Sequence, residues 1–308
     1  MQQTTRFSAL ASAVALSLSL GACSLSGDDG EEVPGLTLLV TPAKGAFGLG
    51  AKCEAFDGAS GAFLATSLTD VSGNCSLQTG QFRGPVVVRV CGGTGVTVFD
   101  ETLAIPANVP LGATECLVAA APAIPAGNAP SIGVTPLTHI AAVAAGVNPA
   151  SATPGAGSAA AITAANAQVK SAVLGTSFNA FDLLDAPVPP RAGNVISTGS
   201  TVGVNYGAFI AALAQSTADP TGAVTSIARA AALAAEFKAG PNKFTTSVAA
   251  VEGAAARLPA VAASFYGAGF TSGIVGLAAV LRPDANVDGT PTVPPIPTGI
   301  AGSSLRGG

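Results

Sequence analysis

Short runs of alternating apolar and polar residues fill the first part of the chain, a spacing that is typical of β-strands. The pattern predicts strands over residues 36–41, 51–57, 63–69 and 84–91. In the second run, Ala51, Cys53 and Ala55 share one face because side chains alternate along a strand. The segment 70–74 predicts a tight turn. Strands this short and closely spaced predict an antiparallel β-sandwich over 35–125.

The apolar spacing changes to that of helices after residue 130. Thr135 is placed to cap a helix that Pro136 begins, since proline tolerates the first helical turn. A second helix is expected over 158–174. Two further apolar stripes follow at helical spacing: Tyr206, Phe209, Ile210 and Leu213; then Phe244, Val248, Val251, Ala255 and Leu258. We therefore expect an all-α bundle over 126–283 and a Pro/Gly-rich tail over 284–308, in a multidomain α+β chain.

The first 22 residues have the pattern of a bacterial export signal. Arg6 precedes an uncharged apolar stretch over 7–22, which is too short for a bilayer span of about 20 residues. The stretch ends in Leu20-Gly21-Ala22-Cys23, which resembles the bacterial lipobox. The resemblance implies cleavage before Cys23 and lipidation of its thiol, with several acyl chains anchoring the protein to a membrane. An ordinary secretory leader with an incidental cysteine is the alternative.

The residues after the lipidated cysteine indicate where the protein resides. Ser24 follows it, and in lipoproteins of this type that favours the outer membrane of the cell envelope. Residues 23–34 are polar and acidic and are expected to form a flexible tether. Only 10% of residues are charged and the net charge is -4, so no basic patch supports a nucleic-acid partner.

Four further cysteines lie within the first third of the mature chain. Cys53, Cys75, Cys91 and Cys116 form an even set, which in an oxidising compartment indicates two disulfides. Three pairings are open. We favour the first cysteine with the second and the third with the fourth, because each pair closes a moderate loop between neighbouring strands. A zinc site is the rival, but no CxxC pair occurs and the only histidine is remote.

A family resemblance covers the start of the β-rich region. The segments 50–57 and 64–75, with the turn Thr69-Asp70-Val71-Ser72-Gly73-Asn74, resemble carboxypeptidase regulatory-like domains and the B-type repeats of bacterial adhesins. The resemblance implies a small prealbumin-like or Ig-like sandwich that acts as a spacer or binding module. Cys75 stands where such domains often carry an aromatic residue, which fits a disulfide in place of ring packing.

The helical part adds a second resemblance but no catalytic signature. Thr-Pro-Leu-Thr at 135–138, leading into alanine-rich helices, is similar to exported proteobacterial lipoproteins of unassigned activity. His139 is the only histidine, so any serine or cysteine nucleophile would have to use it, and capping or packing is the simpler role. The signature motifs of serine hydrolases and of P-loop nucleotide binding do not occur. No catalytic residues and no cofactor are expected.

Two groups of acidic residues were weighed as sites. Asp182 and Asp185 could share a helical face as paired carboxylates, but a cap and a loop turn explain them better. The segment 284–289 matches the first half of a calcium loop, with candidate ligands Asp284, Asn286 and Asp288. Pro295 stands where the loop needs its acidic residue, so an Asx-rich turn is the preferred interpretation.

Residues 258–281 carry no charged side chain and are long enough for a membrane span. Because alanine, glycine and serine dominate this segment, we expect a buried hairpin or core helix instead. The sequence thus predicts a lipid-anchored envelope protein that acts as a non-catalytic structural, ligand-binding or adhesion module for an unknown protein or carbohydrate. The alternatives are an envelope enzyme with a site between its two domains and a membrane-inserted component for assembly or transport.

Overall fold

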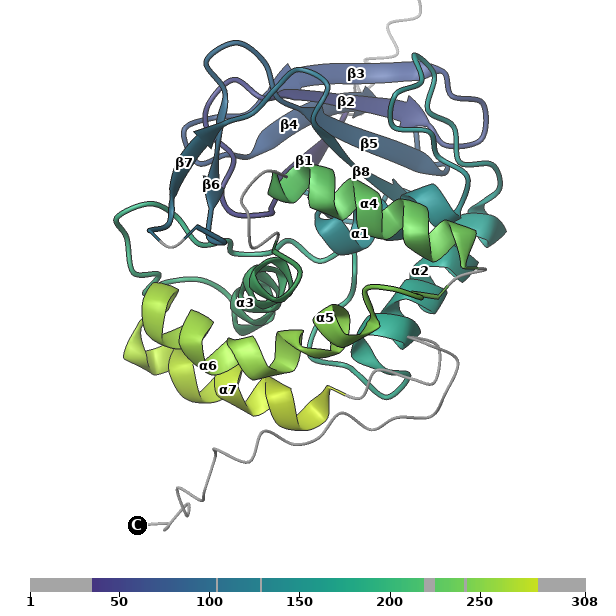
Figure 1. The fold of residues 1–308 in the computed structure, drawn as a ribbon. Coiled ribbons are helices and arrows are strands. Elements are labelled where there is room, and N and C mark those ends of the chain that lie inside the picture. The colour runs from purple at the N-terminus through teal and green to yellow at the C-terminus, as the bar shows by residue number, and fades with distance from the viewer. Residues whose placement is uncertain (1–34, 104, 128, 219–224, 241–242, 282–308) are drawn as a thin grey trace, which may run out of the picture. The chain divides into compact units, whose positions relative to one another are not determined.

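The fold is mixed α+β, as predicted, with β-strands first and helices after them (Figure 1). It is given by a computed structural model that describes residues 35–103, 105–127, 129–218, 225–240 and 243–281. The strands of this described region are β1 (Leu36–Pro42), β2 (Lys52–Asp57), β3 (Phe63–Leu68), β4 (Cys75–Gly80), β5 (Val86–Cys91), β6 (Thr97–Asp100), β7 (Ala107–Pro110), β8 (Cys116–Ala121) and β9 (Ser131–Val134). Its helices are α1 (Pro136–Ala144), α2 (Ala159–Leu174), α3 (Thr201–Ser216), α4 (Ser226–Ala239), α5 (Val248–Glu252), α6 (Ala254–Phe265) and α7 (Ala268–Val280).

The described strands form three sheets, with orders β4-β1-β9, β3-β2-β5-β8 and β6-β7. All neighbours run antiparallel except β1 and β9, which are parallel. The four predicted strands are present. β9 lies in the region that we expected to be helical, and this expectation was wrong for that segment. Ile132 and Val134 are fully buried on β9, so burial against β1 explains why the chain remains extended before α1 begins.

The larger sheets share one apolar core. Buried residues of β1, β4 and β9 belong to the same cluster as the inward residues of β2, β5 and β8. Cys53 on β2 and Cys75 on β4 are disulfide-bonded and link the two sheets. The predicted turn that leads into β4 is also present: the Asp70 carboxylate accepts hydrogen bonds from the backbone N–H groups of Ser72 and Asn74 at 2.8 and 2.9 Å.

The opposite face of the sheet β3-β2-β5-β8 packs against helices and the segment between them. Phe56, Val87 and Val118 point to this side and pack with Ala142 of α1 and Ile162 of α2. α1 begins as predicted. The Thr135 side chain accepts from the backbone N–H of Thr138, and the Thr138 side chain accepts from the backbone N–H of Thr135. Because α1 covers only part of this sheet face, the ends of β2, β5 and β8 remain available for a pocket.

α5, α6 and α7 pack against α3, whereas α4 packs against α1. Buried residues of α1 to α7 contribute to a second apolar core. The apolar stripe that predicted one continuous helix from Phe244 to Leu258 is interrupted. Phe244 precedes α5, and Gly253 ends α5 and caps the start of α6. Tyr266 is extended and separates α6 from α7, so the uncharged segment 258–281 forms two packed helices. Among the described residues, no helix combines the length and the apolar character that a membrane span requires.

Candidate functional site

The principal cavity lies between the helix-facing side of the sheet β3-β2-β5-β8 and α4. Its volume is about 730 Å³, within the range of small-molecule sites. Lys52, Glu54, Arg89 and the Cys91–Cys116 disulfide come from the sheet. The surrounding walls are formed by α4, by residues 113–115, by residues 148–150 and by His139 of α1. We call this cavity the sheet–α4 pocket.

Strand register brings the polar residues of the pocket together. Lys52 lies opposite Cys91 on the neighbouring strand, and Cys91 lies opposite Cys116. Two residues further along β2, Glu54 lies opposite Arg89, which in turn lies opposite Val118 of β8. Because adjacent strands are about 4.8 Å apart, the two rows make a continuous floor across three strands.

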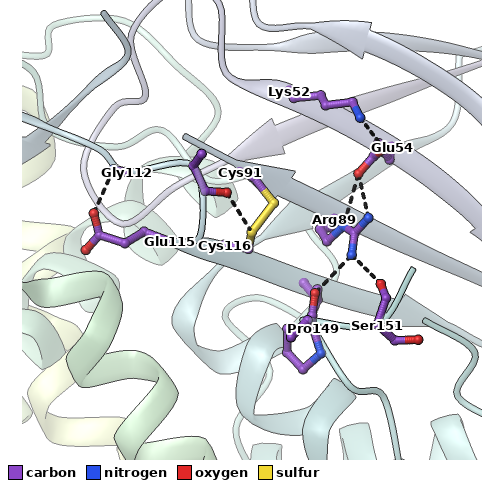
Figure 2. The surroundings of a disulfide bond; sticks show 12 residues. Lys52, Glu54, Arg89, Cys91, Gly112, Glu115, Cys116, Pro149 and Ser151 are labelled. Carbon is purple, nitrogen blue, oxygen red and sulfur yellow. Dashed lines mark hydrogen bonds and ion pairs between the residues drawn. A yellow bond between two sulfur atoms is a disulfide. The ribbon is translucent and has the colours of Figure 1, made fainter. Parts of the chain in front are cut away.

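The charged residues of the two rows form an ion cluster in which Lys52 and Arg89 share the single carboxylate of Glu54. The Lys52 ammonium lies 2.6 Å from Glu54 Oε1. Arg89 donates to Glu54 Oε2 from Nε at 3.0 Å and from Nη2 at 2.8 Å (Figure 2). Burial alone would raise the pKa of Glu54, but the hydrogen bonds from Lys52 and Arg89 outweigh it and hold this pKa below its ordinary value. Glu54 is therefore ionised at neutral pH, and the cluster keeps one surplus positive charge.

Arg89 fixes the wall of the pocket as well as the floor. Its Nη1 donates to the carbonyl oxygens of Pro149 at 3.0 Å and Ser151 at 2.6 Å, which holds the loop after α1 against the sheet (Figure 2). The guanidinium also lies 5.1 Å from the centroid of the Phe56 ring, a cation–π contact. The Arg89 side chain is only 13% exposed, so this side of the pocket is rigidly held before any ligand arrives.

The disulfide between Cys91 and Cys116 supplies an apolar part of the floor. Beyond Cys91, the last residue of β5, the chain continues into Gly92. A Cβ atom at Gly92 would lie 2.3 Å from the carbonyl oxygen of Leu111. Glycine therefore allows the segment that leads into residues 113–115 to pack tightly against the strand end. The pocket rim on this side depends on that close approach.

α4 provides the apolar wall. Its N-cap is Thr225, whose hydroxyl also donates to Glu115 Oε1. Ile227, Ala228 and Ala231 of this helix line the pocket. The other carboxylate oxygen of Glu115 accepts from the backbone N–H of Gly112 at 2.8 Å. Figure 2 shows Glu115 turned toward Gly112, on the other side of the disulfide from the ion cluster.

His139 lies at the inner end of the pocket as a neutral hydrogen-bond donor. Its Nδ1 accepts from the backbone N–H of Val118 at 3.3 Å, so Nε2 carries the proton of the neutral ring. Within the described region no hydrogen bond to Nε2 is present, and His139 lines the pocket. Burial lowers the pKa of His139 to about 4. The ring therefore offers an unpaired N–H group to whatever occupies the cavity.

A second polar cluster is buried away from the pocket. Lys44 is 1% exposed, and its ammonium lies 3.1 Å from Asp100 Oδ1 and 3.1 Å from Glu101 Oε2. Glu101 Oε1 is buried without a hydrogen-bond partner. Burial raises the pKa of Glu101 to about 7, against the opposing attraction of Lys44. The pocket that Lys44 lines in the described region has a volume of about 10 Å³, which is too small for a ligand.

Asp182 and Asp185 line another cavity, of about 420 Å³, together with Lys170. Asp182 and Asp185 lie in a turn and share no helical face: the Asp185 carboxylate accepts from the backbone N–H of Asp182 at 2.7 Å, and Asp182 pairs with Lys170. No group of three or more histidine, cysteine or acidic side chains is placed to hold a metal among the residues described. The lipidation candidate Cys23 and the calcium candidates Asp284, Asn286 and Asp288 lie outside them.

Both favoured cysteine pairs lie at disulfide distance, Cys53 with Cys75 and Cys91 with Cys116. The sequence pattern alone did not indicate a role for Lys52, Glu54 or Arg89. The alternation along β2 gave a partial indication of a polar site, because Lys52 and Glu54 occupy the same side of a strand whose other side is apolar. The partner strand and α4 could not be placed from local pattern alone.

Comparison of the chain with protein-family models, with curated protein sequences and with solved structures gives no match. The function is therefore argued from the geometry and chemistry of the pocket.

Proposed function

We propose that this protein is a lipid-anchored component of the cell envelope whose folded part is a non-catalytic binding module, with the sheet–α4 pocket as its ligand site. The observation that carries this proposal is a cavity of about 730 Å³ whose ion cluster and disulfide are already held in place. Such pre-organisation lowers the free-energy cost of binding, because few side chains need to be ordered when the ligand enters.

The chemistry of the lining supports binding over catalysis. His139 is held by a backbone N–H group, its lowered pKa makes it a weak base, and within the described region no carboxylate bonds it. Glu54 is neutralised by two cations, and Glu115 is occupied by Gly112 and Thr225. The pocket therefore lacks the paired nucleophile and base of acyl-transfer enzymes.

An envelope enzyme is the second candidate, because the only histidine of the chain and several charged groups converge on one cavity. This function would require His139 to take up a proton during turnover, against the burial that lowers its pKa. It predicts an activity that His139→Asn abolishes while ligand binding in the pocket persists.

The proposal extends to the type of sandwich that the strands form and to its relation with the helices. We infer that the strands form a sandwich of the carboxypeptidase regulatory-like type, with the helices as an accompanying bundle. The shared core of the two larger sheets and the Cys53–Cys75 disulfide between them support the sandwich. The parallel pairing of β1 with β9 is the feature that joins this sandwich to the helical part.

The anchor is tested by labelling cells with an alkyne analogue of palmitate. We expect the wild-type protein to incorporate the label and to partition with membranes. Cys23→Ser should abolish both properties, whereas Ser24→Ala should retain the label. A Cys23→Ser protein that remains acylated and membrane-bound would contradict the lipid-anchor proposal.

The binding site is tested with 1-aminoanthracene, an uncharged apolar dye whose fluorescence rises in apolar surroundings. We expect saturable binding of one dye per chain, measured on the full chain with Cys23→Ser so that no detergent is needed. Ala231→Phe should abolish binding, since it fills the pocket from α4. Ala232→Phe is the matched control, because Ala232 is exposed on the same helix and does not line the pocket. Equal binding by both variants would contradict the assignment.

A further inference from the structure

The sheet–α4 pocket has a charge asymmetry that identifies the class of ligand it fits. Lys52 and Arg89 share the single carboxylate of Glu54 on one side of the disulfide, which leaves a surplus positive charge there. Among the described lining residues, Glu115 is the one other carboxylate; it is directed away from Glu54 and is bonded to Gly112 and Thr225. A ligand in the pocket therefore meets positive charge at one end.

Donor capacity at this end is also unused. The Lys52 side chain is 56% exposed, and an ammonium group has three donors, of which Glu54 occupies one. Arg89 uses Nε, one N–H of Nη2 and both N–H groups of Nη1 in its described hydrogen bonds, so one N–H of Nη2 remains. Both cations bond the same carboxylate, and each keeps donor capacity that an anionic group can use.

Apart from Thr114, Glu115, His139 and Asn148, the rest of the lining is apolar. The Cys91–Cys116 disulfide forms the floor next to the cations, and Ile227, Ala228 and Ala231 form the wall above it. His139, Thr114 and Asn148 add neutral polar groups to the lining. A ligand that matches this lining has an apolar body and one anionic group.

We propose that the sheet–α4 pocket binds an apolar organic monoanion, with its carboxylate at Lys52 and Arg89 and its apolar body between the disulfide and α4. This inference rests on the proposed binding function and adds the charge and the orientation of the ligand. Carbohydrates and extended peptides do not fit it, because both would place many polar groups against the alanine wall.

The test is isothermal titration of the full chain carrying Cys23→Ser with octanoate, and with uncharged 1-octanol as the matched probe. Octanoate should bind saturably at one site and more tightly than 1-octanol. Ala231→Phe should abolish octanoate binding, whereas Ala232→Phe should leave it unchanged. These two variants establish that the heat comes from the pocket.

Lys52→Gln tests the charge contact. Lys52 is half-exposed, so the substitution leaves the fold intact, and loss of one charge-assisted contact should weaken octanoate binding about fivefold to tenfold. The binding of 1-octanol should not change. Lys170→Gln is the control, because Lys170 pairs with Asp182 outside this pocket.

The outcomes separate this inference from the proposed function. If 1-aminoanthracene binds in the pocket but octanoate does not, or binds no better than 1-octanol, the monoanion inference is overturned and the binding function stands. Octanoate binding that Ala231→Phe or Lys52→Gln leaves unchanged also overturns the inference. If neither the dye nor octanoate binds, both proposals fail.

Discussion

Glu101 predicts an unusual pH dependence of stability, because its carboxylate is fully buried and one oxygen has no partner. Burial raises its pKa from 4.5 to about 7, although Lys44 at 3.1 Å opposes the shift. A group whose pKa is raised in the folded state stabilises the protein when the pH is below its unfolded-state pKa. This stabilisation is lost as the pH rises through its folded-state pKa. The loss for Glu101 should reach about 3 kcal/mol between pH 4.5 and about pH 8.

Glu101→Gln isolates this contribution, because the amide has the same shape and does not titrate. The variant also loses the ion pair to Lys44, which keeps its contact with Asp100 at 3.1 Å. We therefore expect the difference in free energy of unfolding, variant minus wild type, to rise by about 3 kcal/mol from acid to alkaline pH. The measurement is urea unfolding followed by circular dichroism at several pH values, in the Cys23→Ser background.

His139 has the opposite effect on the pH dependence of stability, so the stability profile of the wild type also tests the reasoning. Burial lowers its pKa from 6.5 to about 4, so its stabilisation is present above 6.5 and is lost as the pH falls through about 4. Between about pH 4.5 and 6.5 the two groups nearly cancel, and the wild-type stability should be flat. Glu101→Gln should therefore gain stability with rising pH in this range. A pH-independent difference between variant and wild type would refute the reasoning.

Three further changes should alter stability in the same unfolding assay. Glu236 accepts hydrogen bonds from three backbone N–H groups before α5, which hold its pKa at about 2 despite burial. Glu236→Gln should cost about 1–3 kcal/mol at neutral pH, and the difference should shrink as the pH falls from 4.5 through about 2. Removal of the Cys53–Cys75 disulfide, which closes a sequence separation of 22, should cost about 3 kcal/mol by the loop-entropy relation. Tyr206→Phe should cost about 1–2 kcal/mol, since the buried hydroxyl bonds a threonine side chain and a backbone carbonyl. If any of these changes alters the free energy of unfolding by less than a few tenths of a kcal/mol, the interaction described for that residue or disulfide would be contradicted.

The elements that sequence reasoning located are those with a local signal. The turn beginning at Asp70 is specified by the Asp70 carboxylate, which accepts hydrogen bonds from backbone N–H groups within the same turn. The start of α1 is specified by the cap at Thr135 followed by Pro136. Elements that depend on distant partners escaped prediction. β9 is short, and its strand character comes from pairing with β1. The division at Gly253 ends a stripe whose spacing alone indicated one helix.

The candidate site escaped prediction for the same physical reason. Lys52 and Glu54 could be assigned to one side of a strand, but register with β5 is required to bring Arg89 beside them. The apolar wall requires α4, half of whose residues are alanine, and no local pattern places this helix beside the sheet. His139 was identified as the sole histidine, yet its free Nε2 became apparent only from the bond that occupies Nδ1.

The central claim is that an exported chain, lipidated on Cys23 and held by two disulfides, presents this pocket at the envelope. Intact mass of the protein purified from membranes, before and after reduction, tests it most directly. The account predicts a chain that begins at Cys23 with attached acyl groups, and a gain of four hydrogens on reduction from the two disulfides. A mass without acyl groups, or one that reduction leaves unchanged, would contradict it.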